Sequence, residues 1–365
     1  MLITIRNIVV YTILSILICS GSNAQTLKPG FDADEYIGVL QRSSLHVDKQ
    51  FQGNLPKEMN FDRIYISPKM GLHNKWDLWL SKDKTTIAIN LRGTTSDVDN
   101  WLENFYTAMI PATGSLALDG KTQFNYKFAN DPKAMVHVGW SVGICSLIPD
   151  IMEKINLWYG KGVKQIIIEG HSQGGALAFL LSAYVYYQVA DGKLPKDLVV
   201  KTYCSAPPKP GNLYFAYDFD FCHRGGWAQA VVNEADWVPE MPFSVQTVSD
   251  INMNPFALTN KTMSKNLIVR WYTKHIYKSL DRHTRSAQKK FEKFLGKVIY
   301  KQVKKYMKEF RQPEYGGSCN YARAGNPVVL EPDAAYYERF PDTGSNIFRN
   351  HLFEPYYYLV NKQYK

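Results

Sequence analysis

Long apolar runs are almost absent from this chain of 365 residues. Residues 8–18 form a largely apolar stretch, but it is too short to cross a bilayer as a stable helix. No later stretch approaches the roughly 18 apolar residues that a membrane span needs, so we do not expect an integral membrane protein after processing. Internal repeats are absent too, and the shares of charged and apolar residues, 21% and 45%, are typical of a globular protein.

The N-terminal segment has the pattern of an export signal. Arg6 places a positive charge before the apolar stretch, and Ser22-Asn23-Ala24 is a cleavage site with small residues at its ends. We therefore expect a signal peptide over residues 1–24 and a secreted or periplasmic mature protein, residues 25–365. A lipoprotein with lipid on Cys19 is the alternative, although the preceding residue is bulky.

Cysteine is scarce as well, with five residues in the chain. Cleavage of the signal peptide leaves four, and an even number in an exported protein permits disulfides in three pairings. They are Cys145, Cys204, Cys222 and Cys319. Cys204 and Cys222 are close in sequence and flank a loop, so that pair is the first expectation, with four buried thiols as the alternative.

The most informative segment is Gly170-His171-Ser172-Gln173-Gly174-Gly175, called the elbow below. An Ile-rich stretch precedes it and an Ala/Leu-rich stretch follows, which predicts a strand, a tight turn and a helix. Its G-x-S-x-G spacing suits a sharp turn, because residues without side chains relieve the crowding around the serine. The serine hydroxyl then lies at a helix N-terminus, where unpaired N–H groups stabilise negative charge. A phosphate-binding loop is disfavoured, since the turn lacks a following lysine and a G-x-G-x-x-G spacing.

Strands and helices alternate along the chain, which predicts an α/β fold with a mostly parallel sheet and helices on both faces. We expect strands at residues 76–80, 85–91, 165–169, 198–203 and 227–233, and helices at residues 144–159 and 174–187.

Residues 261–311 differ sharply from this pattern. They hold sixteen lysines and arginines and three acidic residues. Their net charge of +13 exceeds the net charge of +10 of the whole chain. Their apolar residues recur at helical spacing, so we expect an inserted cationic helical segment at about 256–320. Those residues are Phe291, Phe294, Leu295, Val298, Ile299, Tyr306, Met307 and Phe310. Such a segment docks on an anionic lipid surface or packs on the domain with its lysines in solvent; no motif indicates nucleic acid.

A serine hydroxyl needs a base to remove its proton and an acid to orient that base. In chains with this elbow the acid and the histidine follow the serine in that order. Asp236 follows the predicted strand at 227–233 and is expected at the same sheet edge as Ser172. His351 is the expected base, and the alternatives are His223, His275 and His283.

The developing oxyanion also needs hydrogen-bond donors. Gln173 supplies its N–H directly after the nucleophile, and Thr94 follows an earlier predicted strand. Beyond Thr94, residues 97–110 carry apolar residues at i, i+3, i+4, i+7 and i+11, which predicts an amphipathic helix. This helix covers the acyl groove as a lid, or it simply packs on the domain. Its apolar members are Val98, Trp101, Leu102, Phe105 and Met109.

Five motifs together resemble the class 3 lipases, the fungal-type triacylglycerol lipase family of the α/β-hydrolase fold. They are Arg92-Gly93-Thr94-x-Ser96 with Asp99 and Trp101, then Val136-His137-Val138-Gly139-Trp140, the elbow, the segment 233–239 around Asp236, and Asn350-His351. The resemblance covers about residues 70–245 and 340–360. It implies Ser172, Asp236 and His351 as the catalytic triad, Thr94 and Gln173 as the oxyanion hole, and a structural role for His137.

Three features depart from the family pattern. Asn100 lengthens the spacing between Asp99 and Trp101, the turn at 206–212 is unusually rich in proline, and the cationic insert about doubles the distance between acid and base. We expect an exported serine hydrolase that cleaves glyceride esters without a metal or cofactor. The alternatives are a phospholipase A1, an aryl or feruloyl-type esterase, and a non-catalytic protein that binds lipid surfaces and keeps the fold.

Overall fold

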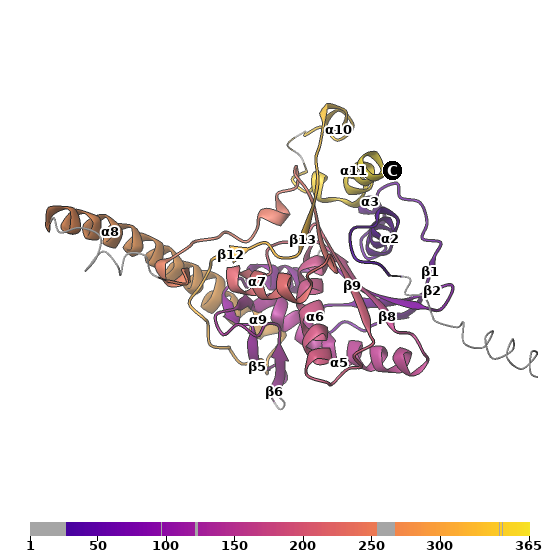
Figure 1. Ribbon diagram of the computed structural model, residues 1–365, viewed down its shortest axis with the longest axis horizontal. Coiled ribbons are helices and arrows are strands. Elements are labelled where there is room, and N and C mark those ends of the chain that lie inside the picture. Colours follow the sequence, from indigo (N-terminus) through magenta and orange to yellow (C-terminus); the bar gives the residue numbers. More distant parts are fainter. Residues whose placement is uncertain (1–26, 96, 121–122, 254–266, 343, 345) are drawn as a thin grey trace, which may run out of the picture.

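The computed structural model describes residues 27–95, 97–120, 123–253, 267–342, 344 and 346–365 (Figure 1). The expected signal peptide with Cys19 lies outside the described residues, and so do Ser96 and the start of the predicted insert. Within the described ranges, no helix is both long enough and apolar enough to cross a membrane.

A seven-stranded sheet forms the centre of the molecule, in the order β1-β2-β3-β8-β9-β11-β13. The first three strands pair antiparallel, and every pair from β3 to β13 is parallel. The strands are β1 (Phe61–Ile66), β2 (Trp76–Ser81), β3 (Thr86–Leu91), β8 (Gln165–His171), β9 (Val199–Ser205), β11 (Ala228–Asn233) and β13 (Asn326–Leu330).

Helices cover both faces of the sheet, as its apolar strands require. Along β8, Ile166 and Ile168 point into one core and Ile167 points into the other, because side chains alternate along a strand. The first core contains α5 (Val138–Gly160) and α6 (Gln173–Ala190). The second contains α2 (Ala33–Ser44) and α11 (Phe353–Tyr364). This arrangement confirms the predicted α/β-hydrolase fold.

Two small sheets and several short helices complete the body. One sheet has the order β12 (Tyr321–Ala322), β10 (Gly211–Asn212), β7 (Met135–His137) and β4 (Met109–Pro111), and the other pairs β5 (Thr113–Ala117) with β6 (Gln123–Lys127). The short helices are α3 (Lys49–Gln52), α4 (Val98–Phe105), α7 (Leu213–Cys222) and α10 (Ala334–Arg339), with 3₁₀ turns at Val238–Glu240, Val248–Asp250 and Arg349–His351.

The cationic insert is one run of helix with two different environments. It comprises α8 (Leu267–Glu292), a π-helical segment (Lys293–Val298) and α9 (Ile299–Tyr306). The apolar face of α9 packs on the first core, where Val303 is fully buried. Helix α8 has no buried residue and extends away from the body in Figure 1.

The predicted helix over residues 97–110 is too long. Helix α4 ends at Phe105, and Met109 lies in strand β4, where it pairs with His137 and is buried. Pairing with β7 satisfies the backbone groups of this segment, which a helix ending beside Pro111 would not. Met109 is therefore excluded as a residue of a lid helix.

The expected Cys204–Cys222 disulfide is absent, and the four described cysteines are free thiols. Cys204 is buried among the residues that α5 and α6 cover, whereas Cys222 lies at the far end of α7. There Cys222 contacts the hydroxyl of Tyr187 at 3.5 Å, and burial raises the pKa of its thiol to about 11. Closeness in sequence did not bring the two thiols together, because α7 carries the chain away between them.

Candidate active site

Ser172 lies at the turn from β8 into α6 with φ of 61° and ψ of −127°. A positive φ in a residue other than glycine stores backbone strain of roughly 1–3 kcal/mol. The turn is held on both sides. The Ser172 N–H donates to the carbonyl oxygen of Ser205 at 2.9 Å, and the Ser172 carbonyl accepts from the N–H of Gly175 at 2.9 Å.

The two glycines of the G-x-S-x-G spacing are required by close backbone contacts. A Cβ on Gly170 would lie 2.3 Å from the carbonyl carbon of Gly174. A Cβ on Gly174 would lie 2.1 Å from the carbonyl oxygen of Leu91, at the end of β3. The first contact closes the turn on itself, and the second brings the start of α6 against the neighbouring strand.

Asp236 and His351 form a buried pair at the same edge of the sheet. The Nδ1 atom of His351 lies 2.6 Å from Oδ2 of Asp236. Asp236 follows β11, which runs parallel to β8 through β9, so the carboxyl ends of these strands share one edge. With its Nδ1 proton donated to the carboxylate, the imidazole keeps Nε2 as a proton acceptor.

Asp236 stays ionised despite its burial. Burial raises the pKa of this carboxyl, but the charge of His351 and the hydrogen bonds that it receives lower the pKa below the usual value. Besides His351, the donors are the N–H of Val238 at 3.0 Å and the hydroxyl of Tyr356 at 2.8 Å. A stable carboxylate is what the imidazolium of a proton-transfer step requires.

His171 connects the turn at Ser172 to the loop that carries His351. Its Nε2 donates to the carbonyl oxygen of His351 at 2.8 Å. Its Nδ1 must then accept from the hydroxyl of Ser205 at 2.9 Å, and that hydroxyl accepts from Tyr36 at 2.6 Å. Burial lowers the pKa of His171 to about 3, so the ring stays neutral and this direction of donors holds. The sequence pattern indicated no role for His171 or Tyr36.

Asn233 also holds the histidine loop. Its side-chain amide donates to the carbonyl oxygen of Asn350 at 3.1 Å and to the hydroxyl of Tyr336 at 2.8 Å. The Tyr336 hydroxyl donates in turn to the side-chain oxygen of Asn350 at 2.8 Å. The residue before His351 is therefore bound through both its backbone and its side chain.

Thr94 and Gln173, the two residues predicted to form an oxyanion hole, are in contact. The Thr94 hydroxyl donates to Oε1 of Gln173 at 3.0 Å and accepts from the side-chain amide of Asn104 at 2.8 Å. Because that hydroxyl proton points at Gln173, the donors left for an oxyanion are the main-chain N–H groups of Thr94 and Gln173. Asn100, which lengthens the family motif, accepts from the N–H of Thr95 at 2.7 Å and fixes this loop; the side chain of Asp99 lies outside the described residues.

Glu103 connects α4 to Gln173, a contact that the sequence pattern did not indicate. Its carboxylate is fully buried and accepts from Nε2 of Gln173 at 2.8 Å and from the amide of Asn74 at 2.5 Å. Two glycines of α5 make room for it. A Cβ on Gly143 would lie 2.3 Å from Oε1 of Glu103, and one on Gly139 would lie 2.0 Å from its carbonyl oxygen.

The remaining lid candidates form part of an aromatic rim beside His351. Trp101 stacks on Phe105 with ring centroids 5.9 Å apart, and it lies 6.0 Å from the ring of Phe348. Phe348 in turn lies 6.1 Å from the His351 ring and 5.3 Å from the Trp237 ring. Phe105 is half exposed, whereas Leu102 packs against the first core.

The other histidines have different surroundings. His223 is buried between Ser182 and the carbonyl oxygen of Phe219. His137 stacks on Trp140 and caps α5, and burial lowers its pKa to about 3. His275 and His283 lie exposed on α8. Among the described histidines, His351 is the one that the geometry brings to Asp236.

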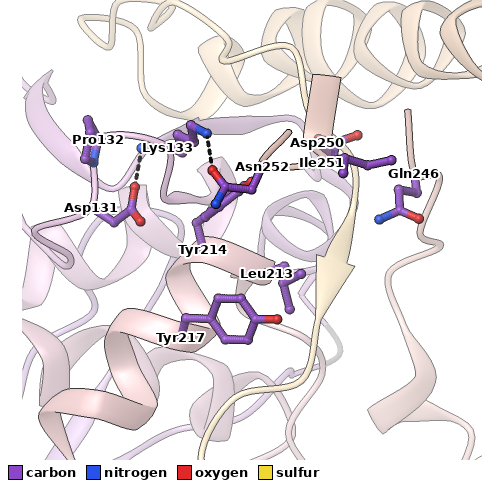
Figure 2. A pocket seen from close by; sticks show the side chains of 10 residues that line it. All are labelled: Asp131, Pro132, Lys133, Leu213, Tyr214, Tyr217, Gln246, Asp250, Ile251 and Asn252. Carbon is purple, nitrogen blue, oxygen red and sulfur yellow. Dashed lines mark hydrogen bonds between the residues drawn. The ribbon is translucent and has the colours of Figure 1, made fainter. Parts of the chain in front are cut away.

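Across the described ranges, the structure holds no group of three or more His, Cys, Asp or Glu side chains positioned to bind a metal ion. A pocket of about 460 Å³ lies beside the start of α7 (Figure 2), where Lys133, Tyr214 and Tyr217 contribute to its wall. None of the predicted site residues lines that pocket.

The known proteins that this chain resembles are lipases. The model of the family described as Lipase (class 3) matches residues 88–246. Secreted mono- and diacylglycerol lipase 3 of Gibberella zeae is 35% identical over 78 residues, which are 21% of this chain and 23% of that protein. Secreted mono- and diacylglycerol lipase MDL2 of Malassezia globosa is 31% identical over 107 residues, 28% of this chain and 32% of that protein. The chain thus spans about a quarter to a third of the length of these curated relatives.

A crystal structure of a triacylglycerol lipase from Penicillium expansum aligns with 58% of this chain and 75% of that chain, at 18% identity and a TM-score of 0.43. A structure of the triacylglyceride lipase of Rhizomucor miehei aligns with 59% and 77%, at 16% identity and a TM-score of 0.43. The region of the family match contains Thr94, Ser172 and Asp236, while His351 lies beyond it. Residues 88–246 are thus similar to the class 3 lipase family, the family that the sequence motifs also resemble.

Proposed function

We propose that this chain is an exported serine ester hydrolase that cleaves acyl esters of glycerides through an acyl-enzyme on Ser172. One observation carries the proposal: the strained Ser172 and the buried Asp236–His351 pair occupy the same edge of the sheet. The family match over residues 88–246 supports the same chemistry.

In the proposed mechanism, Nε2 of His351 removes the hydroxyl proton of Ser172 as its Oγ attacks the ester carbonyl carbon. The Asp236 carboxylate stabilises the imidazolium that forms. The N–H groups of Thr94 and Gln173 stabilise the tetrahedral oxyanion, which then expels the alcohol with the proton from His351. Water attacks the acyl-enzyme in the same way, and the carboxylic acid leaves.

The glyceride substrate and the export are supported by the relatives rather than by the catalytic geometry. Both curated relatives carry the words secreted and mono- and diacylglycerol lipase in their names. The aromatic rim of Trp101, Phe105 and Phe348 suits an acyl chain. A phospholipase A1 or an aryl or feruloyl-type esterase uses the same triad, so the substrate must be measured.

Helix α4 is the proposed lid of this site. Phe105 and Val98 expose apolar surface beside the aromatic rim, as a lid that opens on lipid requires. The bonds of Glu103 hold α4 in the described position, so opening has to break them. A lid predicts a jump in rate once a short-chain ester exceeds its solubility, and smooth saturation through that limit contradicts it.

The test of the proposed function is labelling with a fluorophosphonate followed by a substrate panel. We expect Ser172 to be labelled, and the Ser172→Ala variant to lose the label. The panel contains a triglyceride, a diglyceride, a phospholipid and a short aryl ester, and we expect the highest kcat/KM on a glyceride. Absence of both labelling and hydrolysis refutes the proposal and favours the alternative of a non-catalytic protein.

A further inference from the structure

Helix α8 is the largest described element that the proposed hydrolase mechanism leaves unused. It is 26 residues long and has no buried residue. Most helices in proteins are stabilised by packing an apolar face, so apolar side chains on such an exposed helix need an explanation. At its C-terminal end α8 continues through the π-helical segment into α9, and from there it extends away from the body in Figure 1.

The exposed surface of α8 carries an apolar stripe and a basic stripe, and the exposed Leu267 and Trp271 lie at the N-terminal end of the basic one. Tyr272, Ile276 and Leu280 follow one another at i, i+4 and i+8 and are 61%, 43% and 62% exposed. The basic stripe lies on the other side of the exposed surface and consists of Lys274, Lys278, Arg282, Arg285 and Lys289. Apolar and cationic stripes on one exposed helix are typical of helices that lie in a membrane interface.

Charge identifies the kind of surface. Residues 261–311 carry the excess of sixteen basic over three acidic residues, while the rest of the chain is slightly acidic. Helix α8 carries seven of these basic residues and two of the three acidic ones, so the apolar stripe lies on a helix with a net charge of +5. An anionic bilayer complements both features, because its headgroups attract the basic side chains and its acyl region accepts the apolar ones.

We propose that α8 docks this protein on an anionic phospholipid bilayer, with Tyr272, Ile276 and Leu280 inserted at the boundary of headgroups and acyl chains. The inference names the surface at which the proposed ester hydrolase works, and so it rests on that function. A second copy of the chain is disfavoured as the occupant, because two basic stripes would repel each other. Nucleic acid would bind the charges but leave the apolar stripe without a use.

The anchoring of α8 connects docking to the site. In the π-helical segment, the carbonyl oxygen of Leu295 accepts from the N–H of Ala108 at 3.3 Å. A Cβ on Gly296 would lie 2.9 Å from the Cβ of Ala108, so the two backbones are in close contact. Ala108 follows α4, which carries Glu103 and Trp101. A bilayer that holds α8 therefore also sets the orientation of the segment bordering the catalytic edge.

The experiment measures sedimentation of the full-length mature protein with vesicles of phosphatidylglycerol or of phosphatidylcholine, at low and high sodium chloride. One variant combines Lys274→Glu, Lys278→Glu and Arg282→Glu, and another combines Tyr272→Ser, Ile276→Ser and Leu280→Ser. The matched control makes the same number of reversals on α9 and its end, with Lys301→Glu, Lys304→Glu and Lys308→Glu. Thermal unfolding of each variant verifies that it is folded.

We expect binding to phosphatidylglycerol that weakens at high salt, and at least ten-fold weaker binding to phosphatidylcholine. Each basic residue at an anionic surface strengthens binding about five-fold, so the α8 reversals should remove it almost entirely. The serine variant keeps its charge, but it should bind phosphatidylglycerol at least ten-fold more weakly than the native protein. The α9 control should lose much less vesicle binding than the α8 reversals.

Binding that ignores lipid charge, or a serine variant that binds like the native protein, overturns the inference. An α9 control whose vesicle binding falls as much as that of the α8 reversals also overturns the inference, because binding would then depend on the total charge and not on its position in the chain. A dimer that only the serine variant loses would identify a second copy as the occupant. Tight binding of a DNA duplex by the serine variant, with no vesicle binding by the native protein, would identify nucleic acid. Absent hydrolysis of every ester, with docking intact, refutes the proposed function alone.

Discussion

The sheet edge that holds Ser172, Asp236 and His351 is the proposed catalytic edge, and its side chains differ from those of helix α8 in burial and in hydrogen bonding. At the catalytic edge, Asp236, His171 and Glu103 are buried, and each of them has its hydrogen-bond partners in place. On α8 no side chain is buried, and the residues of each stripe share one property, apolar or basic character. We infer that a single substitution has a large effect at the catalytic edge, because each side chain there has specific hydrogen-bond partners. On α8 a single substitution should have a small effect, because a stripe acts through the sum of its side chains.

The largest expected effect is that of Ser172→Ala. It removes the nucleophile, so turnover of a soluble ester should fall by roughly four to six orders of magnitude. Ser172→Gly should be equally inactive but more stable by about 1 kcal/mol, because glycine adopts the positive φ of this turn without strain. The measurements are ester hydrolysis and urea unfolding. A Ser172→Ala protein with a tenth of the native activity would show that another residue attacks the ester.

Glu103→Ala should have the next largest effect. It leaves the amides of Gln173 and Asn74 without their shared acceptor and opens a cavity beneath α4. We expect a loss of about 3 kcal/mol in the free energy of unfolding, and roughly ten-fold lower kcat with little change in KM. Leu102→Ala on the same helix, which removes packing on the first core instead of the bond to Gln173, is the control for simple loosening of α4. Native kcat in Glu103→Ala would mean that the side chain of Gln173 does not need its anchor.

Acid should destabilise the protein through its buried neutral histidines. Burial lowers the pKa of His171 and His137 to about 3 and that of His46 and His223 to about 4. Each is neutral when folded and takes up a proton on unfolding below the usual histidine pKa of about 6.5. The contribution of these neutral histidines to the free energy of unfolding is therefore fully present above about pH 6.5 and is lost as the pH drops toward 4.

Each of these histidines contributes at most about 1.4 kcal/mol per pH unit in that range. Asp236 acts at lower pH, because its depressed pKa keeps its contribution until the pH falls below the usual carboxylate range. Urea unfolding from pH 7 to pH 4 measures the slope. A His223→Asn variant should reduce it by about one proton, and an unchanged slope would show that His223 is not neutral in the folded protein.

The smallest effect, and the sharpest comparison within the insert, is that of Val303→Ala against Ile276→Ala. Val303 on α9 is fully buried, so its truncation should lower the free energy of unfolding by roughly 2 kcal/mol. Ile276 on α8 is exposed, and its truncation should change stability by less than about 0.5 kcal/mol. Equal losses in urea unfolding would show that α8 is packed in solution and would remove the basis for its docking role.

The sequence by itself determined the local parts of this protein. The apolar run before the elbow, its two glycines and the Ala/Leu-rich run after it predicted strand, turn and helix, and the structure has β8, the strained Ser172 and α6 there. The order of Ser172, Asp236 and His351 also indicated a shared sheet edge, because a parallel sheet places the carboxyl ends of its strands together. Their catalytic roles remain predictions.

Only the tertiary structure decided which distant groups meet. The contact of Glu103 with Gln173 depends on two glycines of α5 that admit α4, and the bond of His171 to His351 joins residues 180 positions apart. The same dependence on long-range packing separated Cys204 from Cys222. It also buried the apolar face of α9 while leaving α8 exposed, because helical periodicity shows that a helix has an apolar face but not what covers it.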